Sequence, residues 1–164
     1  MSLIPESALP AYTILHVAIS LAAIAAGFIV MFGMIANKQL AGWHTFFLVT
    51  TILTSVTGFG FPIKGMTPGV AIGLISLVIL AIVVYARSAK HLAGWWRPVY
   101  VIGATVAFFF NFFVLIVQSF MKIPALHALA PAIPPAGPIF GAVQGVVLIA
   151  FLIAGWRAVK AVRA

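Results

Sequence analysis

Five long apolar runs constrain this chain more than any other feature of its sequence. A helix rises about 1.5 Å per residue, so about 20 residues cross a hydrocarbon core of roughly 30 Å. The runs lie at 12–36, 43–61, 69–86, 98–120 and 139–156. Because 65% of the residues are hydrophobic and 6% are charged, the chain has too little polar surface for a water-soluble domain. The sequence therefore predicts an all-α, polytopic transmembrane bundle of five spanning helices.

The segments between the runs predict the topology. The connections 37–42, 62–68 and 87–97 are short, so we expect successive helices to lie antiparallel in an up-down bundle. The segment 121–138 is longer and contains five prolines, which prevent one regular helix. We expect this segment to form a stiff cap over the bundle and residues 1–164 to form a single domain.

Basic and aromatic residues predict the orientation. Lysine and arginine near the ends of spans are retained on the cytoplasmic side of a membrane. With the amino terminus outside and the carboxyl terminus in the cytoplasm, Lys64 and Lys122 lie outside. The inner residues are then Lys38, Arg87, Lys90, Arg97, Arg157, Lys160 and Arg163. All four tryptophans, Trp43, Trp95, Trp96 and Trp156, fall at the same predicted cytoplasmic edge, where indole rings anchor spans in the headgroup region.

Two runs contain glycines spaced by four residues. Gly69 and Gly73 form one such pair, and Gly137, Gly141 and Gly145 form two consecutive pairs. This spacing puts the glycines on one helix face, where a neighbouring backbone can approach closely. We expect close helix packing there, within the monomer or in a homodimer.

Polar side chains gather in the half of the bundle predicted to be outer. Asn111, Gln118 and Lys122 form one stripe, because they lie at i, i+7 and i+11 of the fourth run. Gln144 in the fifth run shares roughly the depth of this stripe. An unpaired amide in hydrocarbon is costly, so these groups should bond to neighbouring helices or line a ligand pocket. Both alternatives stay open at this point.

Hydroxyl groups are frequent in the second run, where Thr50, Thr54 and Thr57 share one face. A helical threonine can donate a hydrogen bond to a carbonyl of its own preceding turn. We therefore interpret these threonines as locally satisfied rather than as ligands.

The histidines raise a second interpretation, because neutral imidazole ligates haem iron. His16 and His127 lie on the predicted outer side, and His44 and His91 lie at the inner edge. Two levels of histidines would suit a b-type cytochrome, although no helix carries two histidines spaced for stacked haems. His16 is the one ionisable group clearly inside a predicted span, which marks it as a candidate functional residue.

The remaining composition limits the classes of function. Glu6 is the sole acidic residue and cysteine is absent, so hydrolysis, group transfer and thiolate chemistry are poorly served. A proton-coupled transporter normally keeps an acidic residue within the membrane, and nucleic-acid binding needs a basic face that the apolar runs do not leave. We thus expect no enzymatic activity and no nucleic-acid partner.

Three classes of function remain. The first is an accessory or assembly subunit that contacts membrane lipids and packs in a homo-oligomer or a larger membrane complex. The second is a binding protein for a lipid or quinone, with no cofactor; its candidate contacts are His16, Asn111, Gln118, Lys122 and Gln144. The third is a haem b cytochrome that exchanges electrons with quinol, with ligands drawn from the four histidines.

Four stretches of the chain carry a resemblance. They are TGFGFP (57–62), LAGWWRP (92–98), NFFVLIVQSF (111–120) and MKIPALHALAP (121–131). Their run and order resemble a group of small, multi-span bacterial membrane proteins to which no activity is assigned. The resemblance implies a bacterial cytoplasmic (inner) membrane setting, and it implies neither an activity nor a cofactor.

Overall fold

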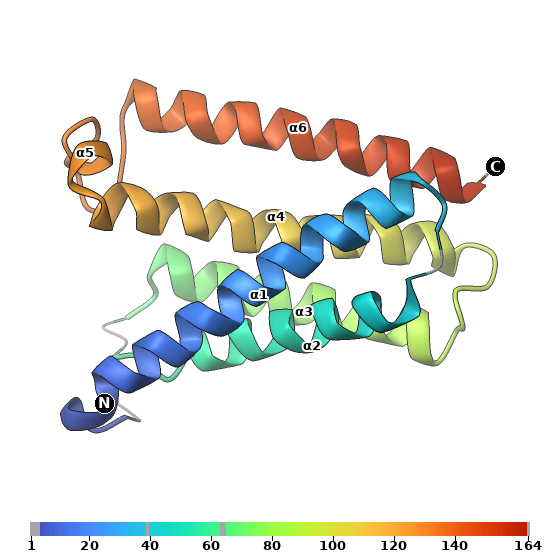
Figure 1. Cartoon of the computed structure of the whole chain (residues 1–164), viewed down its shortest axis with the longest axis horizontal. Coiled ribbons are helices and arrows are strands. Elements are labelled where there is room, and N and C mark those ends of the chain that lie inside the picture. Colours follow the sequence, from blue (N-terminus) through green and yellow to red (C-terminus); the bar gives the residue numbers. More distant parts are fainter. Residues whose placement is uncertain (1–3, 39, 63–64, 164) are drawn as a thin grey trace.

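The chain folds into long helices that run along a common axis (Figure 1). The computed structural model describes residues 4–38, 40–62 and 65–163. Its elements are η1 (Glu6–Ala8), α1 (Leu9–Ile35), α2 (Ala41–Gly58), α3 (Pro68–Ser88), α4 (Trp96–Lys122), α5 (Pro124–His127) and α6 (Pro138–Arg163). No strand occurs in the described residues, which confirms the all-α prediction.

Successive long helices run in opposite directions, so the two ends of the chain lie at opposite ends of the bundle (Figure 1). We call these the amino-terminal end and the carboxyl-terminal end of the bundle. The helices α1, α2, α3, α4 and α6 form a closed ring, in which each contacts the next and α6 contacts α1. Contacts from α4 to α1 and α2 cross this ring.

Four of the long helices are long and apolar enough to cross a membrane, so the chain is a multi-pass membrane protein. These candidate spans are Glu6–Ile35, Pro68–Ser88, Trp96–Lys122 and Pro138–Val162. The helix α2 has 18 residues and is not among them, because His44 and the threonine and serine side chains lower its mean hydropathy. As predicted, Thr50, Thr54 and Thr57 donate to carbonyls of their own helix, at 2.7, 2.9 and 2.6 Å.

The packed core occupies the carboxyl-terminal half of the bundle. Its residues come from the second half of α1 and α3, from the first half of α2 and α4, and from Ala158 of α6. Phe108 lies at its centre, with ring centroids 5.0 Å from Phe28, 6.2 Å from Phe47 and 4.9 Å from Phe151. These edge-to-face contacts stabilise the crossing of α1, α2, α4 and α6. The core therefore leaves the amino-terminal half of the bundle less filled.

The predicted glycine faces do not pack inside the monomer as expected. A Cβ atom added at Gly141 or Gly145 would meet nothing within 4 Å among the described residues, so these glycines face open space. At Gly73 the Cβ would meet the ring of Phe59 at 3.0 Å, which is a loop side chain and not a helix backbone. The prediction of close packing within the monomer was thus wrong for Gly141 and Gly145. The alternative, close packing in a homodimer, stays untested.

The proline-rich segment 121–138 lies beyond the ends of α4 and α6 (Figure 1). It contains the short helix α5, which packs against α4. The rings of Phe120 and Phe140, on either side of the segment, meet edge to face at 5.4 Å. The segment is therefore a compact connection from the end of α4 to the start of α6, at the amino-terminal end of the bundle.

Candidate functional site

A cavity of about 590 Å³ lies in the amino-terminal half of the bundle, where the packed core is absent. Side chains from α1, α2, α3 and α4 line it. Figure 1 shows that α1 crosses the bundle at a tilt, and the residues packed in the core belong to its second half. The first half of α1 stays against α2 but diverges from α4, so the space between α1 and α4 stays open. We call this space the amino-terminal cavity.

One wall of the amino-terminal cavity is the polar stripe of α4. Asn111, Gln118 and Lys122 all line the cavity, from its middle to its end. The Nδ2 atom of Asn111 donates to Thr51 Oγ1 on α2 over 3.5 Å, a long hydrogen bond that leaves most of the amide free for another partner. The structure brings these three side chains to one space, and their contact with a ligand stays a prediction.

The opposite wall contains His16, which α2 holds in place. Its Nδ1 atom lies 2.7 Å from Thr57 Oγ1, and the Thr57 hydroxyl donates to the Leu53 carbonyl at 2.6 Å. Because a hydroxyl has one proton to donate, the Thr57 oxygen accepts from His16 Nδ1, which leaves Nε2 of the neutral ring as an acceptor. The hydroxyl of Tyr12 donates to the Thr57 carbonyl at 2.6 Å and fixes the start of α1 on the end of α2.

The rest of the cavity wall mixes apolar side chains with hydroxyls. Its apolar residues include Val17, Leu21, Ile24, Phe59, Ile72, Phe110, Val114 and Leu115. Its hydroxyl residues are Thr13, Ser20, Thr54, Ser55, Thr67, Ser76 and Ser119, and none of them was among the ligand contacts predicted from the sequence. Several of them donate to their own helix, so their oxygens remain as acceptors; Ser20 to His16 O at 2.7 Å is one example. A single serine within an apolar run, such as Ser76, is the sequence feature that could have indicated these cavity hydroxyls.

Gln144 does not line the amino-terminal cavity. Its Nε2 atom donates to the backbone carbonyl of Phe113 on α4 at 3.2 Å, and its Oε1 atom is buried without a partner among the described residues. Gln144 therefore bonds to a neighbouring helix, which is the first of the two alternatives predicted for the amides. Asn111 and Gln118 lie where the second alternative, a ligand pocket, would place them, because both line the cavity.

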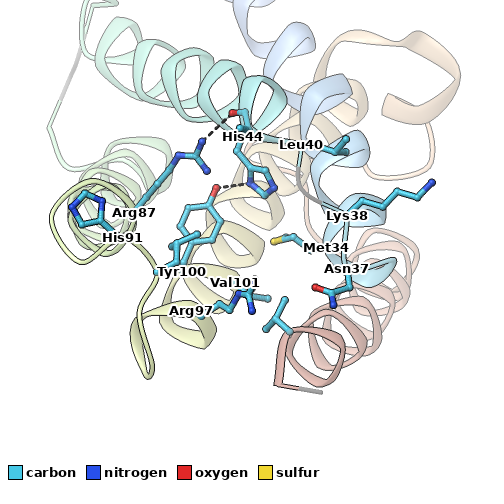
Figure 2. A pocket seen from close by; sticks show the side chains of 13 residues that line it. Met34, Asn37, Lys38, Leu40, His44, Arg87, His91, Arg97, Tyr100 and Val101 are labelled. Atoms are coloured by element: carbon cyan, nitrogen blue, oxygen red, sulfur yellow. Dashed lines mark hydrogen bonds between the residues drawn. The ribbon is translucent and has the colours of Figure 1, made fainter.

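The other histidines lie elsewhere. His44 and His91 line a second cavity of about 330 Å³ at the carboxyl-terminal end, where His44 Nδ1 lies 2.7 Å from the Tyr100 hydroxyl (Figure 2). His127, at the end of α5, lines neither cavity among the described residues. Among these residues, His16 is thus the one histidine at the amino-terminal cavity, and a haem there would have a single histidine ligand.

The described residues contain no group of three or more histidine, aspartate or glutamate side chains placed to hold a metal ion. The chain matches no known protein family, no curated protein and no solved structure.

Proposed function

We propose that this protein is a non-catalytic membrane component that holds a hydrophobic ligand with a polar head, such as a lipid or a quinone, in the amino-terminal cavity. The observation that carries the proposal is the convergence of His16, Asn111, Gln118 and Lys122 on one space of about 590 Å³ between otherwise apolar helices. Ligand sites in proteins have volumes of about 300 to 1,000 Å³, apolar walls and a few oriented polar groups.

The polar groups of the cavity suit an oxygen-rich head. Gln118 and Lys122 supply N–H donors near the end of α4, and His16 supplies an acceptor through Nε2. Asn111 lies deeper along the same wall, beside the apolar side chains of Val114 and Leu115. A ligand can match both the polar and the apolar side chains of this wall. Its carbonyl or hydroxyl oxygens would bond to the polar groups, and its apolar part would contact α1 and α3.

The membrane placement in this proposal has five crossings, with the amino terminus outside. The helix α2 fits a crossing because it lies within the ring, between α1 and α3. Basic residues support the orientation, since Lys38, Arg87, Arg97 and Arg157 lie at the carboxyl-terminal end while Lys122 lies at the other. Lys64 lies outside the described residues. In this orientation the amino-terminal cavity opens in the outer half of the membrane, which we assign to a bacterial cytoplasmic membrane from the resemblance above.

The proposal also includes a protein partner that packs against α6. The face of α6 that carries Gly141 and Gly145 is open in the monomer, and large apolar side chains such as Val146 and Leu152 are exposed beside it. Small residues on an open span favour close association with another helix. We therefore keep a homo-oligomer or a larger membrane complex as the expected setting of this accessory subunit.

The ligand is tested by extraction from protein purified in mild detergent from its own host membrane. Organic extracts are analysed for lipids and quinones by mass spectrometry, and ligand is counted per protein. We expect one species to be retained near stoichiometry and Gln118→Leu to lower its retention at least about tenfold, because one hydrogen bond to a polar head is lost in a low-dielectric site. Gln144→Leu is the matched control, since it makes the same chemical change outside the cavity.

Equal retention in both variants would overturn the proposal. The same preparation distinguishes the haem alternative by an oxidised and a dithionite-reduced absorbance spectrum. A stoichiometric Soret band that shifts on reduction, and disappears in His16→Leu, would replace the lipid or quinone by haem b.

A further inference from the structure

The second cavity, at the carboxyl-terminal end of the bundle, is lined by more basic side chains than the first. It has a volume of about 330 Å³ and lies among the turn after α1, the start of α2, the end of α3 and the start of α4. Figure 2 shows its side chains; Val162 of α6 also lines it. We call this space the carboxyl-terminal cavity.

Its charged side chains are all basic. Arg87, Arg97 and Lys38 line the cavity, and His44 and His91 add two imidazoles. Glu6, the sole acidic side chain of the sequence, lies in η1 at the opposite end of the bundle. Like charges around one space repel one another, and the repulsion is relieved when an anion enters. The charge pattern of the cavity therefore favours an anionic ligand.

Arg87 is held in position before any ligand binds. Its Nη2 atom donates to the Ala41 carbonyl at 2.9 Å and lies 3.4 Å from Thr45 Oγ1, so α2 fixes the guanidinium that projects from α3. The guanidinium also hydrogen-bonds the Tyr100 side chain, and since it has five N–H donors, others remain for a ligand. A fixed guanidinium with remaining donors loses little entropy on binding an anion.

The base of the cavity is a buried polar pair. His44 is 8% exposed and Tyr100 is 2% exposed, and the 2.7 Å contact between Nδ1 and the hydroxyl joins α2 to α4. In Figure 2 these two side chains meet beside Arg87, while Lys38 points away from them. The fixed part of the cavity is thus Arg87, His44 and Tyr100, with Arg97 on the α4 side.

We propose that the carboxyl-terminal cavity binds an anionic phosphate group, with Arg87 and Arg97 as its ligands. Arginine recognises phosphate through parallel N–H donors as well as through charge. Basic pockets between helices at a membrane surface bind the phosphate groups of anionic lipid headgroups. A soluble phosphate carries the same group. This site is separate from the amino-terminal cavity and does not rest on the function proposed for it.

Basic residues that only flank a span lie differently in this protein. Arg157 and Lys160 of α6 are exposed and line neither cavity, and Lys160 Nζ lies 4.4 Å from the Trp156 ring. Arg87 and Arg97 are half-buried and face a common space. The contrast gives a matched control, because Arg157→Gln removes the same charge from the same end of the bundle.

The test titrates delipidated protein in neutral detergent with dioleoyl phosphatidylglycerol, followed by native mass spectrometry, and in parallel with inorganic phosphate by calorimetry. We expect Arg97→Gln and Arg87→Gln each to weaken binding at least about tenfold, and Arg157→Gln to change it less than about twofold. The thermal unfolding midpoint of each variant verifies that the bundle is intact. Of the two arginines, Arg87 is the one that bonds to the Ala41 carbonyl, so Arg87→Gln can also weaken the packing of α3 on α2. If Arg87→Gln unfolds, Arg97→Gln still tests the site.

The two titrations distinguish the source of the phosphate. Lipid binding that depends on both arginines assigns a headgroup, and inorganic phosphate binding with the same dependence assigns a soluble phosphate. Equal weakening in Arg157→Gln and Arg97→Gln, or no binding of either probe to the unmutated protein, would overturn the proposal.

Discussion

Replacing Gly27 by alanine tests whether tertiary contact, and not glycine spacing, decides which glycines this bundle needs. Gly27 lies in α1 and has no part in the GxxxG pairs of the sequence. A Cβ atom at this position would lie 2.5, 2.6 and 2.9 Å from Cδ2, Cε2 and Cγ of the Phe108 ring. Real Cβ atoms essentially never come this close, so the ring or the helix must move.

The surroundings of Phe108 prevent an easy adjustment. Its side chain is 2% exposed, and the rings of Phe28, Phe47 and Phe151 surround it. Adding a methyl group to such a packed site costs about 1 to 3 kcal/mol. Against this, alanine is favoured over glycine in a helix by roughly 0.5 to 1 kcal/mol. We expect Gly27→Ala to lower the free energy of unfolding by up to about 2.5 kcal/mol, the largest difference between these two ranges.

Gly141→Ala is the matched control, because its Cβ would meet nothing within 4 Å among the described residues. Both variants make the same chemical change in a long helix, so the helix-propensity contribution is common to both. The difference between their unfolding free energies therefore isolates the steric cost, about 1 to 3 kcal/mol. Unfolding in mixed detergent micelles of increasing sodium dodecyl sulfate, followed by near-ultraviolet circular dichroism, measures that difference.

A result in which Gly27→Ala is as stable as Gly141→Ala would refute this reasoning, because the two helices would then tolerate the methyl group equally. A second check is the double variant Gly27→Ala with Phe108→Leu. If the clash is with the ring, the two destabilisations are less than additive, because the smaller side chain leaves room for the methyl group.

Two further predictions concern Gln144 and the crossing by α2. Gln144→Leu is expected to change the free energy of unfolding by less than about 1 kcal/mol, since losing the bond to the Phe113 carbonyl is offset by removing a buried acceptor without a partner among the described residues; a loss above about 2 kcal/mol in the same unfolding assay would contradict this. The chain lacks cysteine, so single variants Ala36→Cys and Met66→Cys report topology through a membrane-impermeant maleimide in spheroplasts. We expect labelling from outside at residue 66 and not at residue 36, because α2 lies between them; labelling of both from one side would exclude a crossing by α2.

Much of the fold could be predicted because membrane spans are a local property of sequence. The apolar runs matched the long helices to within a few residues, apart from the basic end of α6, which continues to Arg163. Short connections predicted the antiparallel order. The second run was predicted as a span like the others; it forms the helix α2, whose polar side chains keep it out of the four candidate spans.

The candidate site was predictable in part, for a geometric reason. Depth along a span follows from residue number and helical rise, so Gln144 and the stripe of Asn111 and Gln118 were rightly compared by depth. Rotation about the helix axis follows from packing against neighbours. Gln144 turns toward the Phe113 carbonyl, whereas Gln118 turns toward the amino-terminal cavity.

The sequence by itself determined that this chain is helical and apolar enough to lie in a membrane, because run length and composition are read one segment at a time. Only the tertiary structure decided which side chains meet. It packed Phe108 on Gly27, left Gly141 open and gathered Arg87 and Arg97 around one space. The physical reason is that helix tilt and rotation are set jointly by all the packed helices, and no single segment carries that information.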